Sequence, residues 1–159
     1  MEFETITIDR RDAVWLLTLD RQDRLNAMNQ KMLSEIETAC DVIDADSSCR
    51  VVILTGAGKA FTPGFDLQDQ ATKTPNGIEE WRPVLQRDFD SVIRFWNLTK
   101  PTIAAVNGPA LAGGWGLAMA CDITIAGASA SFGEAEVKFG AGIVVMLLPW
   151  IVGPKKAKE

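Results

Sequence analysis

Histidine is absent from the 159-residue sequence. This absence excludes the Ser-His-Asp and Cys-His arrangements, in which an imidazole activates a serine or a cysteine, so a serine protease is excluded as well. It also removes the commonest zinc ligand. Any proton transfer must therefore use a carboxylate, a lysine or the dipoles of the backbone.

Cysteine and clustered positive charge are scarce. The three cysteines, Cys40, Cys49 and Cys121, are widely spaced, so neither a disulfide framework nor a thiolate metal site is indicated. The formal net charge is −5, and the densest group of lysines lies at residues 155–158, which does not suggest a nucleic-acid partner. The acidic N-terminus lacks the basic character of a targeting peptide, and we expect a cytoplasmic protein.

Long uninterrupted hydrophobic runs are also missing. Residues 141–152 are too few to span a bilayer, and residues 102–126 are interrupted by polar residues and a proline. No membrane partner is expected. A chain of this length, with 47% hydrophobic residues, is long enough for one domain with a substantial core, so we expect a single domain over residues 1–159.

The apolar pattern predicts strands that alternate with helices, the arrangement of an α/β fold. The predicted strands are Thr5–Asp9, Val14–Leu19, Val51–Thr55, Thr102–Val106 and Ile123–Ala126, the first two joined by a turn at residues 10–12. The predicted helices are Met28–Ala45, Trp81–Trp96, a helix from Gly113 onward and a buried helix over Gly142–Val152. Residues 58–69 and 127–131 are expected to be loops.

The second predicted helix carries a stripe of large apolar residues. The stripe consists of Trp81, Leu85, Phe89, Val92 and Trp96. Their helical spacing predicts that they pack in the core rather than bind a ligand. Pro83 would then lie in the first turn of this helix, where a missing N–H is tolerated.

Two predicted strands are each followed by a glycine-rich loop, at residues 56–64 and 107–114. This repetition suggests successive turns of a spiral whose two loops face one another across a ligand. The first N–H groups of the helix at Gly113 have no internal partners, so they could bind a carbonyl oxygen that becomes negative. The alternative is that these glycines only allow tight packing of a strand against a helix.

Two acids, Glu134 and Glu136, stand among the apolar residues Phe132, Val137 and Phe139. Apolar surroundings predict that one of the acids is partly buried with a raised pKa, as a proton-transferring carboxylate requires. The alternative is a solvated pair on a loop, where most glutamates are found.

Four segments, in this order, resemble the enoyl-CoA hydratase/isomerase (crotonase) superfamily. They are Arg24–Met28, Ala60–Leu67, Asn107–Asp122 and Phe132–Glu136. The resemblance covers essentially the whole chain. It implies a crotonase-like α/β fold, a spiral of β-β-α turns, and assembly as a homotrimer or as a hexamer made of two trimers.

The resemblance also implies roles for individual residues. The backbone N–H groups of Phe65 and Gly113 would form an oxyanion hole for a thioester carbonyl, and Glu136 would exchange a proton with a substrate carbon. The residues that would line the coenzyme A path are Leu25, Ala27, Phe65, Asp66, Leu67 and Gln68. Coenzyme A would enter as part of the acyl-CoA substrate, without a prosthetic group or a metal.

The chain departs from the family pattern in two respects. Gly116 occupies the position of the other glutamate of two-acid hydratases, so hydration would require Glu134 or another acid, whereas Glu136 alone suffices to shift a double bond. The resemblance also implies that family members continue into C-terminal helices that cover the acyl pocket and build the trimer, and we expect this chain to lack them. The predicted function is hydration of, or a double-bond shift in, an enoyl-CoA; the alternative is a non-catalytic acyl-CoA-binding or assembly subunit.

Overall fold

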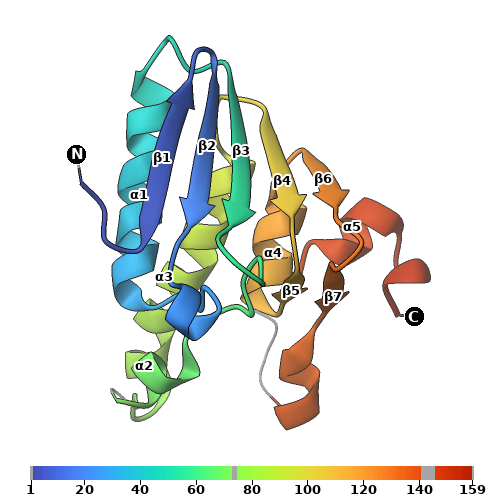
Figure 1. Cartoon of the computed structure of the whole chain (residues 1–159). Helices are drawn as coiled ribbons and strands as arrows, with labels where there is room; N and C mark the ends of the chain where they lie inside the picture. Colours follow the sequence, from blue (N-terminus) through green and yellow to red (C-terminus); the bar gives the residue numbers. More distant parts are fainter. Residues whose placement is uncertain (1, 73–74, 141–145, 159) are drawn as a thin grey trace.

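The computed structural model describes residues 2–72, 75–140 and 146–158. A five-stranded sheet with the order β1-β2-β3-β4-β6 forms one layer, and the helices α1, α3 and α4 cover one face of it (Figure 1). The strands are β1 (Ile6–Arg11), β2 (Val14–Leu19), β3 (Val51–Gly56), β4 (Thr102–Val106) and β6 (Ile123–Ala126). The helices are α1 (Gln30–Ala45), α3 (Ile78–Trp96) and α4 (Gly113–Ala120).

The sheet is mainly parallel, and this brings the loops that follow its parallel strands to one edge. β2, β3, β4 and β6 run parallel to their neighbours, while β1 pairs with β2 in an antiparallel hairpin. The turn of this hairpin is tighter than the sequence predicts, because β1 continues to Arg11 and Asp12 turns the chain with a φ of 52°. The carboxyl ends of the parallel strands meet at the lower edge of the sheet in Figure 1.

The core lies between the sheet and the helices. Alternate residues of β2 and β3 point toward the helices and are fully buried, among them Leu17, Leu19, Val52 and Leu54. The residues between them face the other side of the sheet and remain partly exposed. This period-two alternation places one face of the sheet against the helices.

A second, two-stranded sheet was not predicted from the sequence. It pairs β5 (Pro109–Leu111) with β7 (Ser131–Gly133) in parallel. Three residues are too few for a recognisable alternation of polar and apolar side chains. The predicted loop at residues 127–131 therefore ends inside the strand β7. The elements β4, β5 and α4 form one β-β-α turn of the spiral, and β6 and β7 begin the next turn.

Short helices complete the chain. They are the 3-10 helices η1 (Gln22–Arg24), η2 (Ala135–Phe139) and η3 (Lys156–Lys158) and the α-helices α2 (Leu67–Ala71) and α5 (Leu148–Val152). The predicted loop at residues 58–69 is thus wrong in its last three residues, which begin α2. Within the described residues, no helix is long and apolar enough to cross a membrane.

The prediction that the apolar stripe of α3 packs in the core is wrong for most of its members. Leu85, Phe89 and Trp96 are 44%, 37% and 54% exposed. Polar contacts with α1 turn a different face of α3 toward the core. The Arg94 guanidinium lies 2.8 Å from the Asp44 carboxylate, and Ser91 Oγ lies 3.3 Å from Glu37 Oε1. The buried face of α3 consists of Asp88, Ser91, Val92 and Phe95.

Two further helix predictions need correction. Pro83 is the sixth residue of α3 rather than part of its first turn, because α3 begins at Ile78. The buried helix predicted over Gly142–Val152 is reduced to α5, since residues 142–145 lie outside the described part of the chain. Trp150 in α5 is 84% exposed, because none of the described segments covers it. Gly153, with a φ of 82°, ends α5.

Candidate active site

The two glycine-rich loops lie against each other, as the repetition in the sequence predicts. β3 and β4 are parallel neighbours, and a bridge between Thr62 and Ala110 joins the loops that follow them. The Leu111 N–H donates to the Thr62 carbonyl over 3.1 Å. A Cβ atom added at Gly64 would lie only 3.0 Å from the Gly113 nitrogen, so the two loops are in direct contact where the candidate donors lie.

Phe65 is held by backbone bonds on both sides of it. The Met28 N–H donates to the Gly64 carbonyl over 2.8 Å, and the Asp66 N–H donates to the Met28 carbonyl over 2.9 Å. The N–H of Phe65 itself donates no hydrogen bond to any residue that the structure describes. Its flanking bonds fix the orientation of this free donor.

Asp66 anchors the same loop. Its carboxylate caps α2 by accepting hydrogen bonds from the N–H groups of Gln68 and Asp69, and it lies 3.1 Å from the Arg21 guanidinium. Burial alone would raise the pKa of Asp66, but the hydrogen bonds from Arg21 and from these two N–H groups outweigh it and hold the pKa below its ordinary value. Asp66 therefore remains charged and keeps the segment that follows Phe65 in place.

Gly113 is the first residue of α4, and a strained residue precedes it. Ala112 has a φ of 54° and a ψ of −129°, a conformation that costs a non-glycine residue about 1–3 kcal/mol. Its N–H donates to the Gly133 carbonyl over 2.8 Å, which ties the loop to β7. The N–H of Gly113 donates no hydrogen bond within the described residues.

Tight packing also requires glycine at the start of α4. A Cβ atom at Gly114 would lie 2.2 Å from the Thr62 carbonyl oxygen, and one at Gly113 would lie 2.6 Å from Cε2 of Phe65. The packing explanation for these glycines is therefore confirmed. It is compatible with the oxyanion role, because the same close approach brings the free N–H group of Gly113 next to Phe65.

Glu136 lies in η2, three residues after the end of β7, and is 8% exposed. Its Oε2 is buried and has no hydrogen-bond partner among the described residues. Two of the apolar neighbours that predict this burial, Phe132 and Val137, are themselves exposed. β7 pairs with β5, so Glu136 follows a strand that lies beside the residues leading to Gly113.

Glu134 is the acid of this pair whose pKa is raised. Burial, and then the neighbouring Glu136, raise the pKa of Glu134 to about 7. The prediction that one of the two acids is partly buried with a raised pKa is thus confirmed. Gly116, where the resemblance would place the other glutamate of two-acid hydratases, is buried within α4 and supplies no acid.

The two segments expected along the coenzyme A path are adjacent. The Arg24 guanidinium donates to Gln68 Oε1 over 2.6 Å and so links the loop of Leu25 and Ala27 to α2. Leu25 has a φ of 53° and is 53% exposed. The side chains of Leu67 and Gln68 are exposed as well, so an apolar side chain points to solvent from each segment.

Asn26 is a structural residue that the sequence reasoning missed. It is fully buried, and its side-chain N–H₂ group donates to the carbonyls of Ala57, Ala60 and Phe61 over 2.9 to 3.2 Å. Its φ of 65° suits asparagine better than most residues. The sequence offered only one indication of this role, an asparagine within a loop that has no hydrophobic periodicity. In the structure, Asn26 holds the loop after β3 in place.

Comparison with known proteins decides the family. A family model described as Enoyl-CoA hydratase/isomerase matches residues 9–159. The chain belongs to the enoyl-CoA hydratase/isomerase family. Crotonyl-CoA hydratase of Syntrophomonas wolfei is 35% identical over 165 residues, a match that covers 100% of this chain and 62% of the relative. Short-chain-enoyl-CoA hydratase of Clostridium acetobutylicum is 38% identical, over 88% of this chain and 53% of the relative.

Solved structures of this family have the same fold. An enoyl-CoA hydratase/isomerase from Xanthobacter autotrophicus Py2 is 55% identical, with a TM-score of 0.96 over 99% of this chain and 58% of that chain. An enoyl-CoA hydratase from Bacillus anthracis is 34% identical, with a TM-score of 0.89 over 98% of this chain and 61% of that chain. The expected crotonase-like α/β fold is confirmed, and the chain spans between about half and two thirds of the length of these proteins.

Proposed function

We propose that this chain, as one crotonase-like domain, binds an acyl-CoA thioester and stabilises its enolate. The observation that carries the proposal is the pair of free N–H groups, of Phe65 and Gly113, on two loops in direct contact. Two such donors, fixed before the substrate binds, can hold the thioester oxygen as it becomes negative. Removing one donor of this kind typically costs about 3–4 kcal/mol of transition-state stabilisation.

Glu136 acts as the acid and base in this proposal. Its carboxylate removes a proton from the carbon next to the carbonyl, and the electron pair of the C–H bond moves toward the carbonyl oxygen to form the enolate. The same proton then returns from Glu136 to a different carbon, which shifts the double bond and leaves the composition of the substrate unchanged. A buried Oε2 without a hydrogen-bond partner among the described residues is available for this transfer.

Hydration of an enoyl-CoA requires a second group to direct the water. Glu134 fits this role, because its pKa of about 7 allows it to hold or release a proton near neutral pH. Coenzyme A runs along Leu25, Ala27 and the backbone of residues 65–68, and no prosthetic group takes part. The assembly is a homotrimer or a hexamer, as the resemblance implies.

A non-catalytic acyl-CoA-binding subunit is the second candidate, and Gly116 at the position of a family glutamate favours it. The test compares turnover of 2-enoyl-CoA and 3-enoyl-CoA by the wild type and by Glu136→Gln. The enzyme proposal predicts turnover that the substitution lowers by a factor of about 10² to 10⁴. Acyl-CoA binding without turnover on either substrate supports the second candidate, and undiminished turnover by Glu136→Gln contradicts the role of Glu136.

A further inference from the structure

The two candidate donors of the oxyanion hole are supported in different ways. Gly113 begins α4, and the carbonyl of the peptide group that carries its N–H, that of Ala112, accepts a hydrogen bond from the Gly116 N–H over 3.1 Å. The helix itself therefore orients and polarises this donor. Phe65 lies outside any helix, because it precedes Asp66, the N-cap residue of α2. Its N–H depends on another source of support.

A chain of hydrogen-bonded peptide groups leads to the Phe65 N–H. The carbonyl of the same peptide group belongs to Gly64, and it accepts a hydrogen bond from the Met28 N–H over 2.8 Å. The carbonyl that shares a peptide group with the Met28 N–H is that of Ala27, and it accepts a hydrogen bond from Nη1 of Arg21. Two planar peptide groups thus connect the Arg21 guanidinium to the Phe65 N–H, which donates no hydrogen bond within the described residues.

The positive charge of Arg21 acts on this chain in one direction. Arginine is permanently protonated, and a hydrogen bond from a charged donor is stronger than one between neutral groups. Each carbonyl that accepts a hydrogen bond draws electron density from the N–H of its own peptide group, which makes this N–H a stronger donor to the next carbonyl. The last N–H of the chain is that of Phe65, and its acceptor would be an oxygen that gains negative charge.

Several contacts hold Arg21 at the start of the chain. Its side chain is 17% exposed, and the same Nη1 lies 3.1 Å from Asp66 Oδ2. Its backbone N–H donates to Asn26 Oδ1 over 3.0 Å, and its carbonyl accepts from the Asn26 N–H over 2.9 Å. The ion pair also offsets the negative charge of Asp66, which directly follows Phe65 and would otherwise oppose a negative oxygen beside it.

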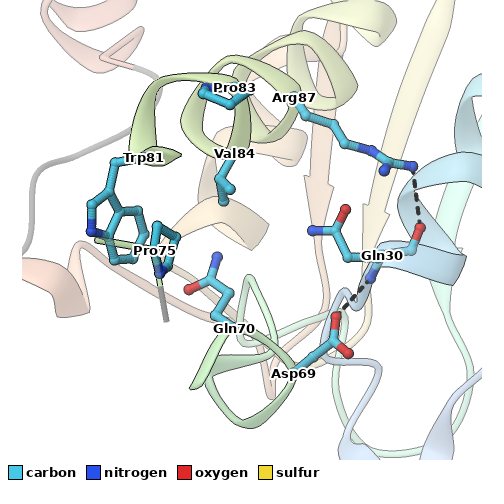
Figure 2. A pocket seen from close by; sticks show the side chains of 8 residues that line it. All are labelled: Gln30, Asp69, Gln70, Pro75, Trp81, Pro83, Val84 and Arg87. Carbon is cyan, nitrogen blue, oxygen red and sulfur yellow. Dashed lines mark hydrogen bonds between the residues drawn. The ribbon is translucent and has the colours of Figure 1, made fainter. Parts of the chain in front are cut away.

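The segment after Phe65 has further supports that do not involve Arg21. The Gln30 N–H donates to Asp69 Oδ2 over 3.1 Å, which joins α2 to the first residue of α1 (Figure 2). The Arg24 guanidinium donates to Gln68 Oε1 over 2.6 Å. Removal of the Arg21 side chain should therefore leave α2 in place, so that the effect on the Phe65 N–H can be measured in the folded protein.

We infer that Arg21 is a positioning residue of the oxyanion hole, which orients and polarises the Phe65 N–H through the two peptide groups between them. The inference rests on the proposed function, because it takes the thioester oxygen to be the acceptor at Phe65. Arg21 acts through the backbone and does not touch the substrate. A polarised donor gains most when its acceptor becomes negative, so loss of Arg21 should weaken enolate formation more than binding of the thioester.

Two measurements with butanoyl-CoA test this inference. The first is the infrared stretching frequency of the bound thioester carbonyl, labelled with ¹³C, which falls as the hydrogen bonds to this carbonyl strengthen. The second is the rate at which the protein exchanges the proton next to the carbonyl in D₂O. For the wild type, the frequency should lie below its value in water. Arg21→Met should reverse part of this shift and slow exchange about tenfold, while Kd for butanoyl-CoA changes by less than about threefold.

Three further variants separate this role from a merely structural one. Arg21→Lys keeps a charged nitrogen for the Ala27 carbonyl and should restore the carbonyl shift and most of the exchange rate. Arg94→Met is the matched control, because Arg94 also forms a partly buried ion pair, 2.8 Å from the Asp44 carboxylate, but lies on α3 outside the site; it should change neither measurement. Arg21→Gln keeps a neutral N–H donor and replaces Arg21→Met if that variant does not fold; it should shift both measurements in the same direction.

The outcomes distinguish this inference from the proposed function. A carbonyl frequency and an exchange rate that remain at the wild-type values in Arg21→Met, or in Arg21→Gln where that variant replaces it, would overturn the inference and leave the proposed function standing. A loss of equal size in Arg21→Lys or in Arg94→Met would also overturn the inference. A wild type that does not bind butanoyl-CoA, or whose bound carbonyl has the same frequency as in water, would overturn the proposed function and this inference with it.

Discussion

Replacing Asp88 by asparagine is expected to stabilise the fold at neutral pH and to have little effect in acid. Burial raises the pKa of Asp88 from 3.8 to about 6, and the nearby Arg87 only partly opposes this. The pKa of this carboxyl group is about two units higher in the folded protein than in the unfolded chain. Once the group is fully charged, the free energy of unfolding is therefore lower by about 3 kcal/mol.

The sign follows from proton linkage. The folded protein binds the Asp88 proton more tightly than the unfolded chain does, because its pKa is raised. The resulting stability is complete below pH 3.8 and is lost as the pH rises through about 6. Asparagine cannot ionise, so the variant keeps its stability where the wild type loses it.

Urea denaturation of the wild type and of Asp88→Asn from pH 4.5 to pH 7.5 measures this effect. The difference in the free energy of unfolding should grow with pH and level off above about pH 6.5, in favour of the variant. Asp90→Asn, at an exposed position of the same helix, should follow the wild type at every pH. A difference between Asp88→Asn and the wild type that stays constant with pH would refute the reasoning.

Three further substitutions test the loops of the site. Gly113→Ala forces a Cβ atom to within 2.6 Å of the Phe65 ring, so turnover of an enoyl-CoA should fall about a hundredfold and the free energy of unfolding should fall by about 1–3 kcal/mol; unchanged kcat would contradict this. Asn26→Ala removes the donor for three carbonyls and should destabilise the fold by about 4 kcal/mol in urea denaturation, whereas a loss below about 1 kcal/mol would show that water replaces the amide. Ala112→Gly relieves the strained backbone and should raise stability by about 1 kcal/mol, and a lower Tm would be inconsistent with strain there.

The sequence predicts the layers of the fold because each long element has an unambiguous period. β2, β3 and β4 alternate with helices and were predicted nearly to the residue. β5 and β7 were missed because each is defined by its partner in space, which three residues cannot indicate. The predicted orientation of α3 was wrong for a related reason. Its apolar residues and its buried residues both recur at helical spacing, and polar contacts with α1 determine which of the two faces is buried.

The site was predictable only in part. Phe65, Gly113 and Glu136 were given their roles by resemblance. The nearness of Phe65 and Gly113 depends on contacts between loops that no local pattern encodes. Asp88 shows a second kind of feature that the sequence does not predict, the burial of a charged side chain. A single aspartate in a polar helix predicts a solvated side chain, so its burial became visible only when the packing of α3 against its neighbours was known.

Exchange of the proton next to the thioester carbonyl tests the central claim most directly, because it requires only enolate formation and no second acid. A saturated acyl-CoA is incubated with the protein in D₂O, and deuterium at that carbon is followed by mass spectrometry. The account predicts exchange catalysed by the wild type that Glu136→Gln slows by a factor of about 10² or more. Exchange by Glu136→Gln at the wild-type rate, or a wild type that binds the thioester without catalysing exchange, would contradict it.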